Sequence, residues 1–438
     1  MTVPIMRDYR VHHSLRLGGR VVSQGTCELH LDDTFLVIKG DRSSRVGYEQ
    51  LESFHLIPGG IELQLFPEGS ARFDGMDGAL VRPLFVHLSH LRGLRWACLL
   101  RYANGTPIDT LECKVELENT PEQEALFHLY PDGLVGMPYG GEPFELLMAD
   151  LQSILRTPEY RLVCSSPSLV VTLYGCEPTY LGRFQRSVEA AHQKMEEETA
   201  NLLVELFPAL EISQLAALTS MLAGGRLASK SDLGQTVPWL WERIEEVVHT
   251  KGAYPEAFAA LKERAGEFLW FGLRRLSEGD AASDQVAQAD SDLTKGTEGT
   301  LNPDGGNDGG PPRDFLLWFL AGVKAGDRRF LAVEVDSGRK GYATYLYRCL
   351  DAVNDAAAFS AAASTISRAM VALNFYREPV YASPRDIESG RFAEYKLAVR
   401  KLQYLRDARA LFVGRVIHSS PENWAAGLQA LISSAGTP

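Results

Sequence analysis

Alternating apolar and polar residues occur in two groups in the first half of the chain. A period of two predicts β-strands with one buried face. Turn residues, Asp32 with Asp33 and Pro131 with Gly133, divide the leading part of each group into a hairpin. The alternating runs are residues 27–31, 34–40 and 60–66 in the first group, and 125–130, 134–137 and 168–174 in the second.

A helical pattern follows each group of strands. Apolar residues recur every three or four positions over 82–103 and over 179–206, which predicts one amphipathic helix at each place. The groups also share a local sequence, because Leu-Glu-Ser-Phe at 51–54 aligns with Leu-Gln-Ser-Ile at 151–154. We therefore predict an internal repeat made of two units, residues 20–103 and residues 104–207.

The order of these elements, antiparallel strands ended by one amphipathic helix, resembles the pleckstrin-homology-like superfold and its GRAM-type variants, used twice in tandem over residues 20–207. The resemblance lies in topology, since this superfold lacks an invariant catalytic or ligand motif. It implies that each helix plugs one end of a bent sheet. It also implies domains that bind phosphoinositides, peptides or other proteins.

Residues 208–276 are predicted to form a helical extension. Helical patterns cover residues 211–223, 237–248 and 255–276, with Pro238 and Pro255 at helix starts. The large aromatic side chains of this region are expected to pack between the helices or against the repeats. They are Trp239, Trp241, Trp270 and Phe271.

Residues 277–312 are predicted to be a disordered acidic linker. They contain eight acidic residues, one lysine and no aromatic residue. Such a segment cannot bury enough apolar surface to offset its chain entropy. The linker separates the first 276 residues from a C-terminal part, residues 313–438.

The C-terminal part is predicted to be a smaller α+β module. Short strands are expected at 314–320, 330–335 and 341–348, followed by an alanine-rich helix at 355–373. A basic amphipathic helix, or two, is expected over 392–416. The whole chain is therefore placed in the α+β class, with two tandem antiparallel sheets, each closed by a helix, ahead of the extension, linker and module.

The net charge of −12 is unevenly distributed, with −11 over residues 104–210 and +5 over 313–438. An acidic chain lacks the basic footprint that phosphate backbones require, so no nucleic-acid partner is expected. The basic C-terminal helix presents Lys396, Arg400 and Arg406 as candidate partner-binding residues. Its partner is expected to be an acidic protein or a membrane, or, within the chain, the acidic linker or the second repeat; a solvated face is the alternative.

Three basic residues of the first unit, Lys39, Arg42 and Arg45, are candidate anion-binding residues. Inositol phosphates require lysine and arginine side chains clustered at the first hairpin. The turn of that hairpin contains Asp32 and Asp33 instead. These three residues could supply only a weaker site, and contact with an anionic membrane is therefore kept as an alternative.

His87 and His90 are three residues apart on the helix predicted at 82–103, a spacing that can direct two imidazoles to one metal ion. No third ligand lies at a suitable spacing, so partly exposed helix histidines are the alternative. Catalytic motifs such as G-x-S-x-G, H-E-x-x-H and G-x-G-x-x-G are absent from the sequence. No catalytic or cofactor-binding residue is assigned, and no cofactor is expected.

The six cysteines are scattered without a CxxC pair, which favours reduced thiols, most of them in the core. The N-terminus has no signal-peptide pattern, and no apolar run reaches the roughly 20 residues that cross a bilayer. The sequence therefore predicts a cytoplasmic, non-catalytic interaction or scaffold protein whose units bind protein partners. The alternatives are a protein that binds anionic membranes peripherally and an enzyme with a site formed between domains.

Overall fold

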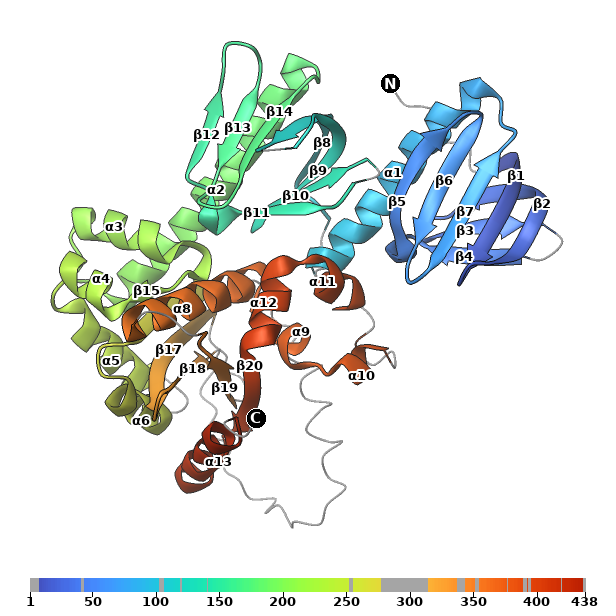
Figure 1. The fold of residues 1–438 in the computed structure, drawn as a ribbon. Coiled ribbons are helices and arrows are strands. Elements are labelled where there is room, and N and C mark those ends of the chain that lie inside the picture. Colours follow the sequence, from blue (N-terminus) through green and yellow to red (C-terminus); the bar gives the residue numbers. More distant parts are fainter. Residues whose placement is uncertain are drawn as a thin grey trace. The chain divides into compact units, whose positions relative to one another are not determined.

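Two seven-stranded antiparallel sheets, each followed by one long helix, form the first part of the chain (Figure 1). The computed structural model describes residues 8–40, 43–101, 106–118, 120–139, 141–251, 255–276, 314–336, 343–350, 354–375, 377–388, 392, 395–418 and 420–435. The predicted linker, 277–312, lies outside these residues. The chain divides into two units, Met1–His192 with Ile387–Leu402, and Gln193–Asp386 with Gln403–Pro438.

The two sheets of the first unit have the same strand order. The first runs β4 (Ser43–Gly47), β3 (Phe35–Lys39), β2 (Arg20–Leu31), β1 (Asp8–Leu17), β7 (Gly69–Asp74), β6 (Gly60–Leu65), β5 (Leu51–Ile57). The second runs β11 (Phe144–Leu147), β10 (Gly133–Pro138), β9 (Gln123–Tyr130), β8 (Asp109–Leu117), β14 (Val170–Tyr174), β13 (Leu162–Ser165), β12 (Ser153–Arg156). Strands seven apart in number occupy equivalent places, so the α+β repeat predicted from the sequence is confirmed.

The aligned sequences at 51–54 and 151–154 occupy the same place in both sheets. A 3₁₀ turn precedes each of them, η1 (Tyr48–Gln50) and η2 (Met148–Asp150), and each turn is capped by a leucine, Leu51 or Leu151. The predicted unit 20–103 leaves out β1, which pairs with both β2 and β7. The first sheet therefore includes residues that precede the predicted unit, from Asp8 onward.

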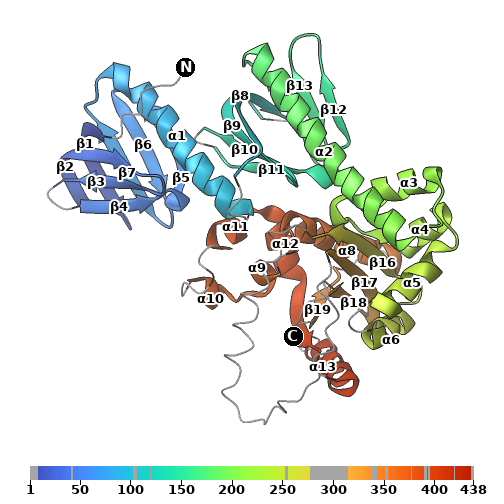
Figure 2. The same ribbon diagram turned by 180° about the vertical axis from the view of Figure 1, so that it is seen from behind.

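One long helix lies along a face of each sheet, α1 (Gly78–Arg101) on the first and α2 (Pro178–Leu206) on the second (Figure 1, Figure 2). Leu181, Phe184 and Val188 of α2 are fully buried. The Arg183 guanidinium pairs with Asp109 of β8 at 2.8 Å, which fixes α2 against its sheet. Both predicted closing helices are confirmed. We call β1–β7 with α1 the first sheet domain, and β8–β14 with the start of α2 the second.

The second unit contains a third antiparallel sheet. Its order is β15 (Ala228–Ser229), β16 (Leu269–Arg275), β17 (Phe315–Ala325), β18 (Arg328–Asp336), β19 (Ala343–Arg348), β20 (Phe412–Ile417). The three C-terminal strands expected from the sequence, β17 to β19, are confirmed. The helices and 3₁₀ turn of residues 212–265 are α3 (Ile212–Leu222), η3 (Ala223–Gly225), α4 (Lys230–Thr236), α5 (Leu240–Lys251) and α6 (Pro255–Ala265). Those of residues 355–434 are α8 (Asp355–Ala372), α9 (Glu378–Tyr381), α10 (Pro384–Glu388), α11 (Lys396–Lys401), α12 (Gln403–Leu411) and α13 (Pro421–Ser434).

Two helical predictions are wrong at their C-terminal ends. The helix expected over 255–276 ends at Ala265, and β16 follows it. The basic helix expected over 392–416 is divided into α11 and α12, and its last residues form β20. Both strands gain partners distant in sequence, because β16 pairs with β17 and β20 with β19. The predicted extension and the C-terminal module therefore share one sheet.

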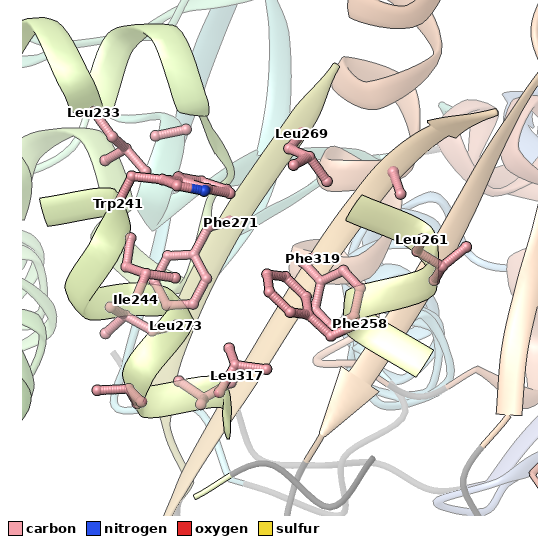
Figure 3. Close-up of a cluster of buried hydrophobic side chains, with 14 of the residues drawn as sticks. Leu233, Trp241, Ile244, Phe258, Leu261, Leu269, Phe271, Leu273, Leu317 and Phe319 are labelled. Atoms are coloured by element: carbon pink, nitrogen blue, oxygen red, sulfur yellow. The ribbon is translucent and has the colours of Figure 1, made fainter. Parts of the chain in front are cut away.

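Helices cover one face of the third sheet with a large apolar cluster, shown in Figure 3. Phe258 of α6 meets Phe319 of β17 edge to face, with ring centroids 4.8 Å apart. Trp241 and Phe271, two of the predicted packing anchors, lie in the same cluster. Burial of these aromatic side chains, together with the many aliphatic ones in the cluster, drives the packing of the helices onto the sheet.

The opposite face has a close approach between a glycine and a tryptophan. Gly272 of β16 lies directly across from Trp318 of β17, and a Cβ atom at Gly272 would overlap the indole. Trp318 is fully buried, and its Nε1–H donates to the carbonyl of Gly225 at 2.9 Å. Only glycine leaves room for this arrangement.

We therefore expect Gly272→Ala to destabilise the second unit by about 1–3 kcal/mol, as overpacking of a core does. Gly234→Ala is the matched control, because Gly234 lies in α4 and faces open space; alanine there is expected to be neutral or stabilising by up to about 1 kcal/mol. Urea unfolding followed by tryptophan fluorescence measures both. Equal stability of the two variants would contradict the packing argument.

Candidate binding site on the first sheet domain

Helix α1 and the turn η1 form the floor of the candidate site. Trp96 of α1 is fully buried, and its Nε1–H donates to the Tyr48 carbonyl at 2.7 Å. The Arg92 guanidinium lies over the Trp96 ring, 3.9 Å from its centroid. It donates to the carbonyls of Leu51 at 3.1 Å and Glu52 at 2.7 Å. These bonds hold the start of β5 against α1.

Arg92 is a buried cation, with 4% of its surface exposed. Burial lowers its pKa to about 10, and the nearby carboxylates of Glu142 and Glu52 act in the opposite direction. The guanidinium therefore stays charged at neutral pH. A third bond, 3.2 Å to the carbonyl of Gly141, extends this network to the second sheet domain.

A segment from the far end of the chain occupies this floor. We call residues 395–402, which include α11, the docked segment. Its apolar side chains Tyr395, Leu397 and Leu402 are buried, and α11 packs against α1 (Figure 2). The segment belongs to the first unit although about 300 residues of chain separate it from α1.

Two consecutive basic residues, Arg400 and Lys401, fix the end of the docked segment. Arg400 pairs with Glu52 at 2.8 Å, donates to the Glu49 carbonyl at 3.0 Å, and lies 3.9 Å from the centroid of the Phe66 ring. Lys401 pairs with Glu52 and, at 2.8 Å, with Glu142 of the second sheet domain. We call Glu49, Glu52, Phe66, Arg92, Trp96 and Glu142 the docking site.

These ion pairs are shielded from solvent. Only 9% of the Lys401 side chain and 19% of the Arg400 side chain is exposed. Burial lowers the pKa of Arg400, while Glu52, Glu142 and Glu49 raise it. Shielded charges with partners contribute more than exposed ones, and leaving either partner alone is costly. The carboxylates of the docking site therefore favour basic residues at positions 400 and 401.

The six basic residues predicted as anion or partner contacts do not form one site. Arg400 lies in the docking site, whereas Lys396 on the same helix is exposed. Arg406 lies on α12 in the second unit, exposed and bonded to Gln403 at 2.6 Å. Lys39 and Arg45 lie exposed on the adjacent strands β3 and β4, with Arg45 over the Phe35 ring. Arg42 lies outside the described residues.

The predicted histidine pair lies on α1, with His87 half-buried and His90 exposed. Within the part of the chain that the structure describes, no group of three or more histidine, cysteine or acidic side chains is placed to hold a metal ion. The described residues also contain no helix long and apolar enough to cross a bilayer.

A third histidine, His128 of β9, is fully buried, and neither ring nitrogen has a hydrogen-bond partner among the described residues. Burial lowers its pKa to about 4, and the nearby His90 acts in the same direction. The ring is therefore neutral in the folded protein at neutral pH. The sequence pattern does not indicate that His128 is buried; in the structure the last six positions of β9, polar and apolar alike, are all buried.

The second unit contains a buried polar cluster, in which the His418 ring pairs with Glu334 at 3.1 Å and Thr344 bonds to Glu334. Trp424 of α13 donates to Thr344 at 2.6 Å. Glu334 and Thr344 are buried, and 3% of the His418 side chain is exposed, so the cluster ties α13 to the sheet. Thr344 provides the hydroxyl of this cluster and is fully buried. Solvent therefore does not reach the hydroxyl.

A cavity of about 340 Å³ lies at another part of this unit, between β20, α12 and α13. Its charged lining residue is Arg348, which donates to the Ala435 carbonyl at 3.0 Å. The other lining residues are Ala410, Leu411, Phe412, Val413, Ser434 and Ala435. This lining provides no paired acid and base of the kind that general catalysis uses.

Most of the docking site escapes prediction from the sequence. Glu52 lies within the repeated motif at 51–54, and Trp96 within the apolar stripe of its helix, but neither pattern indicates binding. Arg92, Lys401 and Glu142 carry no local signal. The signal in the sequence that could identify these residues is the presence of opposite charges in distant segments.

The ion pair between Glu52 and Lys401 is expected to couple the docked segment to α1. Replacing both residues by alanine, singly and together, should give a coupling free energy of at least about 1 kcal/mol for opening of residues 396–402. The pair Arg243 and Glu246 on α5 is the control, with side chains 61% and 57% exposed; it should couple by less than about 0.5 kcal/mol. Native-state hydrogen exchange measures both. Equal coupling would show that shielding adds nothing.

Acid is expected to weaken the first unit through His128. Its pKa is lowered on folding, so the stability that the neutral ring provides is complete above pH 6.5. The free energy of unfolding decreases as the pH falls toward 4, because the unfolded chain then binds a proton that the buried ring does not. The loss approaches about 3 kcal/mol below pH 4. Urea unfolding between pH 7 and 4 should show a flatter pH dependence for His128→Leu than for the wild type. The exposed His249, changed to glutamine, should leave the dependence unaltered.

No protein-family model matches the chain, and a search of curated proteins finds no match. The function is therefore inferred from the chain's own residues, of which the docking site is the most developed arrangement.

Proposed function

We propose that the protein is a non-catalytic interaction scaffold whose first sheet domain binds a short helix ending in two consecutive basic residues. The docked segment is an internal example of such a ligand. A protein partner with an arginine and a lysine at the end of an amphipathic turn would displace it and take its place. The two sheet domains are, in this proposal, tandem pleckstrin-homology-like domains of the GRAM type.

One observation carries this proposal: the end of the docked segment is held by side chains on two different domains. Lys401 reaches Glu52 on the first sheet domain and Glu142 on the second. Arg400 adds an aromatic contact with Phe66. Charge pairing sets the orientation of a ligand, while buried aromatic and apolar contacts contribute affinity.

Short interaction helices commonly bind through apolar anchors at helical spacing. The docked segment has this character, since Leu397 and Ala398 are buried and Lys396 faces solvent. A tethered segment is present at high effective concentration, so a partner must compete with it. The protein is therefore a scaffold whose own docked segment competes with its partner.

The test uses full-length protein and a fluorescent peptide of residues 395–404. The variant Arg400→Glu/Lys401→Glu should release the docked segment and bind the peptide at least about 10-fold more tightly than the wild type. Adding Glu52→Lys to this variant should abolish binding, because it repels the basic pair. Fluorescence anisotropy measures the affinities, and circular dichroism checks that each variant is folded.

The control peptide has glutamate at positions 400 and 401. If it binds as well as the natural peptide, the site does not recognise basic residues. Equal binding of the natural peptide to the wild type and to the released variant would show that the docked segment does not occupy the ligand's place. Either outcome contradicts the proposal.

A further inference from the structure

Two cysteines of the second sheet domain come together although 62 residues separate them in the chain. Cys113 lies on β8, and Cys176 lies in the three-residue connection between β14 and α2. The antiparallel pairing of these strands ends at Tyr174 opposite Lys114, which brings the next residues of the chain beside Cys113. Gly175 has a φ of +75° and turns the backbone there. The Cys113 and Cys176 thiols lie close enough to affect each other's ionisation.

The two thiols differ in access and in acidity. Cys113 belongs to the buried face of β8, with 6% of its surface exposed, whereas Cys176 is half-buried. The neighbouring Cys113 thiol lowers the pKa of Cys176, and the same interaction, together with burial, raises the pKa of Cys113. A reactive cysteine needs a thiolate that solvent can reach. Cys176 meets both conditions, and the buried Cys113 thiol beside it is the second cysteine that a disulfide requires.

The buried cysteines elsewhere lack these properties. Burial raises the pKa of Cys27 to about 11 and that of Cys164 to about 12. Each is surrounded by the core of its sheet and reacts poorly as a thiol. The chain therefore provides its own unreactive controls, one in each sheet domain.

We infer that Cys113 and Cys176 form a redox-active pair that cycles between two thiols and a disulfide through exchange with a small-molecule disulfide. Continued by one residue, the strand register places Gly175 opposite Cys113, so Cys176 is the next residue along the chain. The turn at Gly175 leaves the Cys176 thiol beside that of Cys113. This inference concerns the second sheet domain and does not depend on the proposed function of the docking site.

The exchange takes place in two balanced steps. The Cys176 thiolate attacks one sulfur of the small disulfide, whose S–S bond breaks and releases one thiolate that takes a proton from water. Cys113 then loses its proton to solvent, and its sulfur attacks the Cys176 sulfur of the mixed disulfide. A second small thiol leaves. The two cysteines lose two electrons, and the small disulfide gains them as it becomes two thiols.

The product would tie β8 to the start of α2. Arg183 of α2 already pairs with Asp109 of β8, so the disulfide would close the same junction covalently. A covalent closure of a long loop restricts the unfolded chain. Oxidation should therefore raise the unfolding temperature of the second sheet domain, and reduction should restore the original value.

The experiment incubates the full-length protein with oxidised and reduced glutathione in graded ratios, then blocks free thiols and maps peptides by mass spectrometry. The wild type should give a disulfide joining the peptides of Cys113 and Cys176. Cys113→Ala should stop at a glutathione adduct on Cys176, and Cys176→Ser should leave Cys113 unmodified. Cys27→Ser and Cys164→Ser should still form the bond.

The pH dependence of Cys176 alkylation gives a second readout that does not require the disulfide. The rate should be half-maximal at a lower pH in the wild type than in Cys113→Ala, because the Cys113 thiol lowers the pKa of Cys176. A persistent glutathione adduct on Cys176 of the wild type would overturn the inference. An alkylation profile unchanged by Cys113→Ala would overturn it as well, because the second thiol would then have no effect on the first.

Discussion

Helix α1 is buried on two sides at once, and the rest of the first unit depends on this. One side fills the first sheet through Leu84, Leu88 and Leu91. The other side meets the second sheet domain, where a Cβ on Gly93 would touch Leu126 and Met137 at ordinary contact distances. Trp96 and Arg92 then join the C-terminal half of the helix to η1. Apolar residues on two sides of a helix stabilise it only when both sides are covered, so the packing of α1 requires both sheet domains.

The docking site follows from that double burial. Arg92 donates its hydrogen bonds to backbone carbonyls and not to the carboxylate of Glu52. That carboxylate pairs instead with Arg400 and Lys401. A buried positive charge next to two further cations is tolerable only because Glu49, Glu52 and Glu142 lie among them. Charge balance and apolar anchoring act together, which is why a segment of so few residues can be held in a defined orientation.

The second unit shows how long-range pairing overrides a local pattern. Residues 269–273 are apolar and follow a helix, so they fit a helical continuation as well as a strand. Strand β17 follows residues 277–312 in the sequence, and its backbone groups form hydrogen bonds with those of β16. The same reasoning applies to β20, whose basic and apolar residues fit a helical stripe until β19 provides a partner. Strand preference depends on the neighbours that a strand finds.

The sequence by itself determined the duplicated sheet-and-helix plan, the closing helices, the strands β17 to β19 and the aromatic packing residues, because these follow from hydrophobic period and turn chemistry, which are local. Only the tertiary structure decided that β1 completes the first sheet, that β16 and β20 are strands, and that Arg400 and Lys401 meet Glu52 and Glu142. It also brought Cys113 and Cys176 together and buried His128 without a partner. Each of these depends on residues far apart in the chain, whose proximity is set by register and by packing between elements rather than by the composition of any one segment.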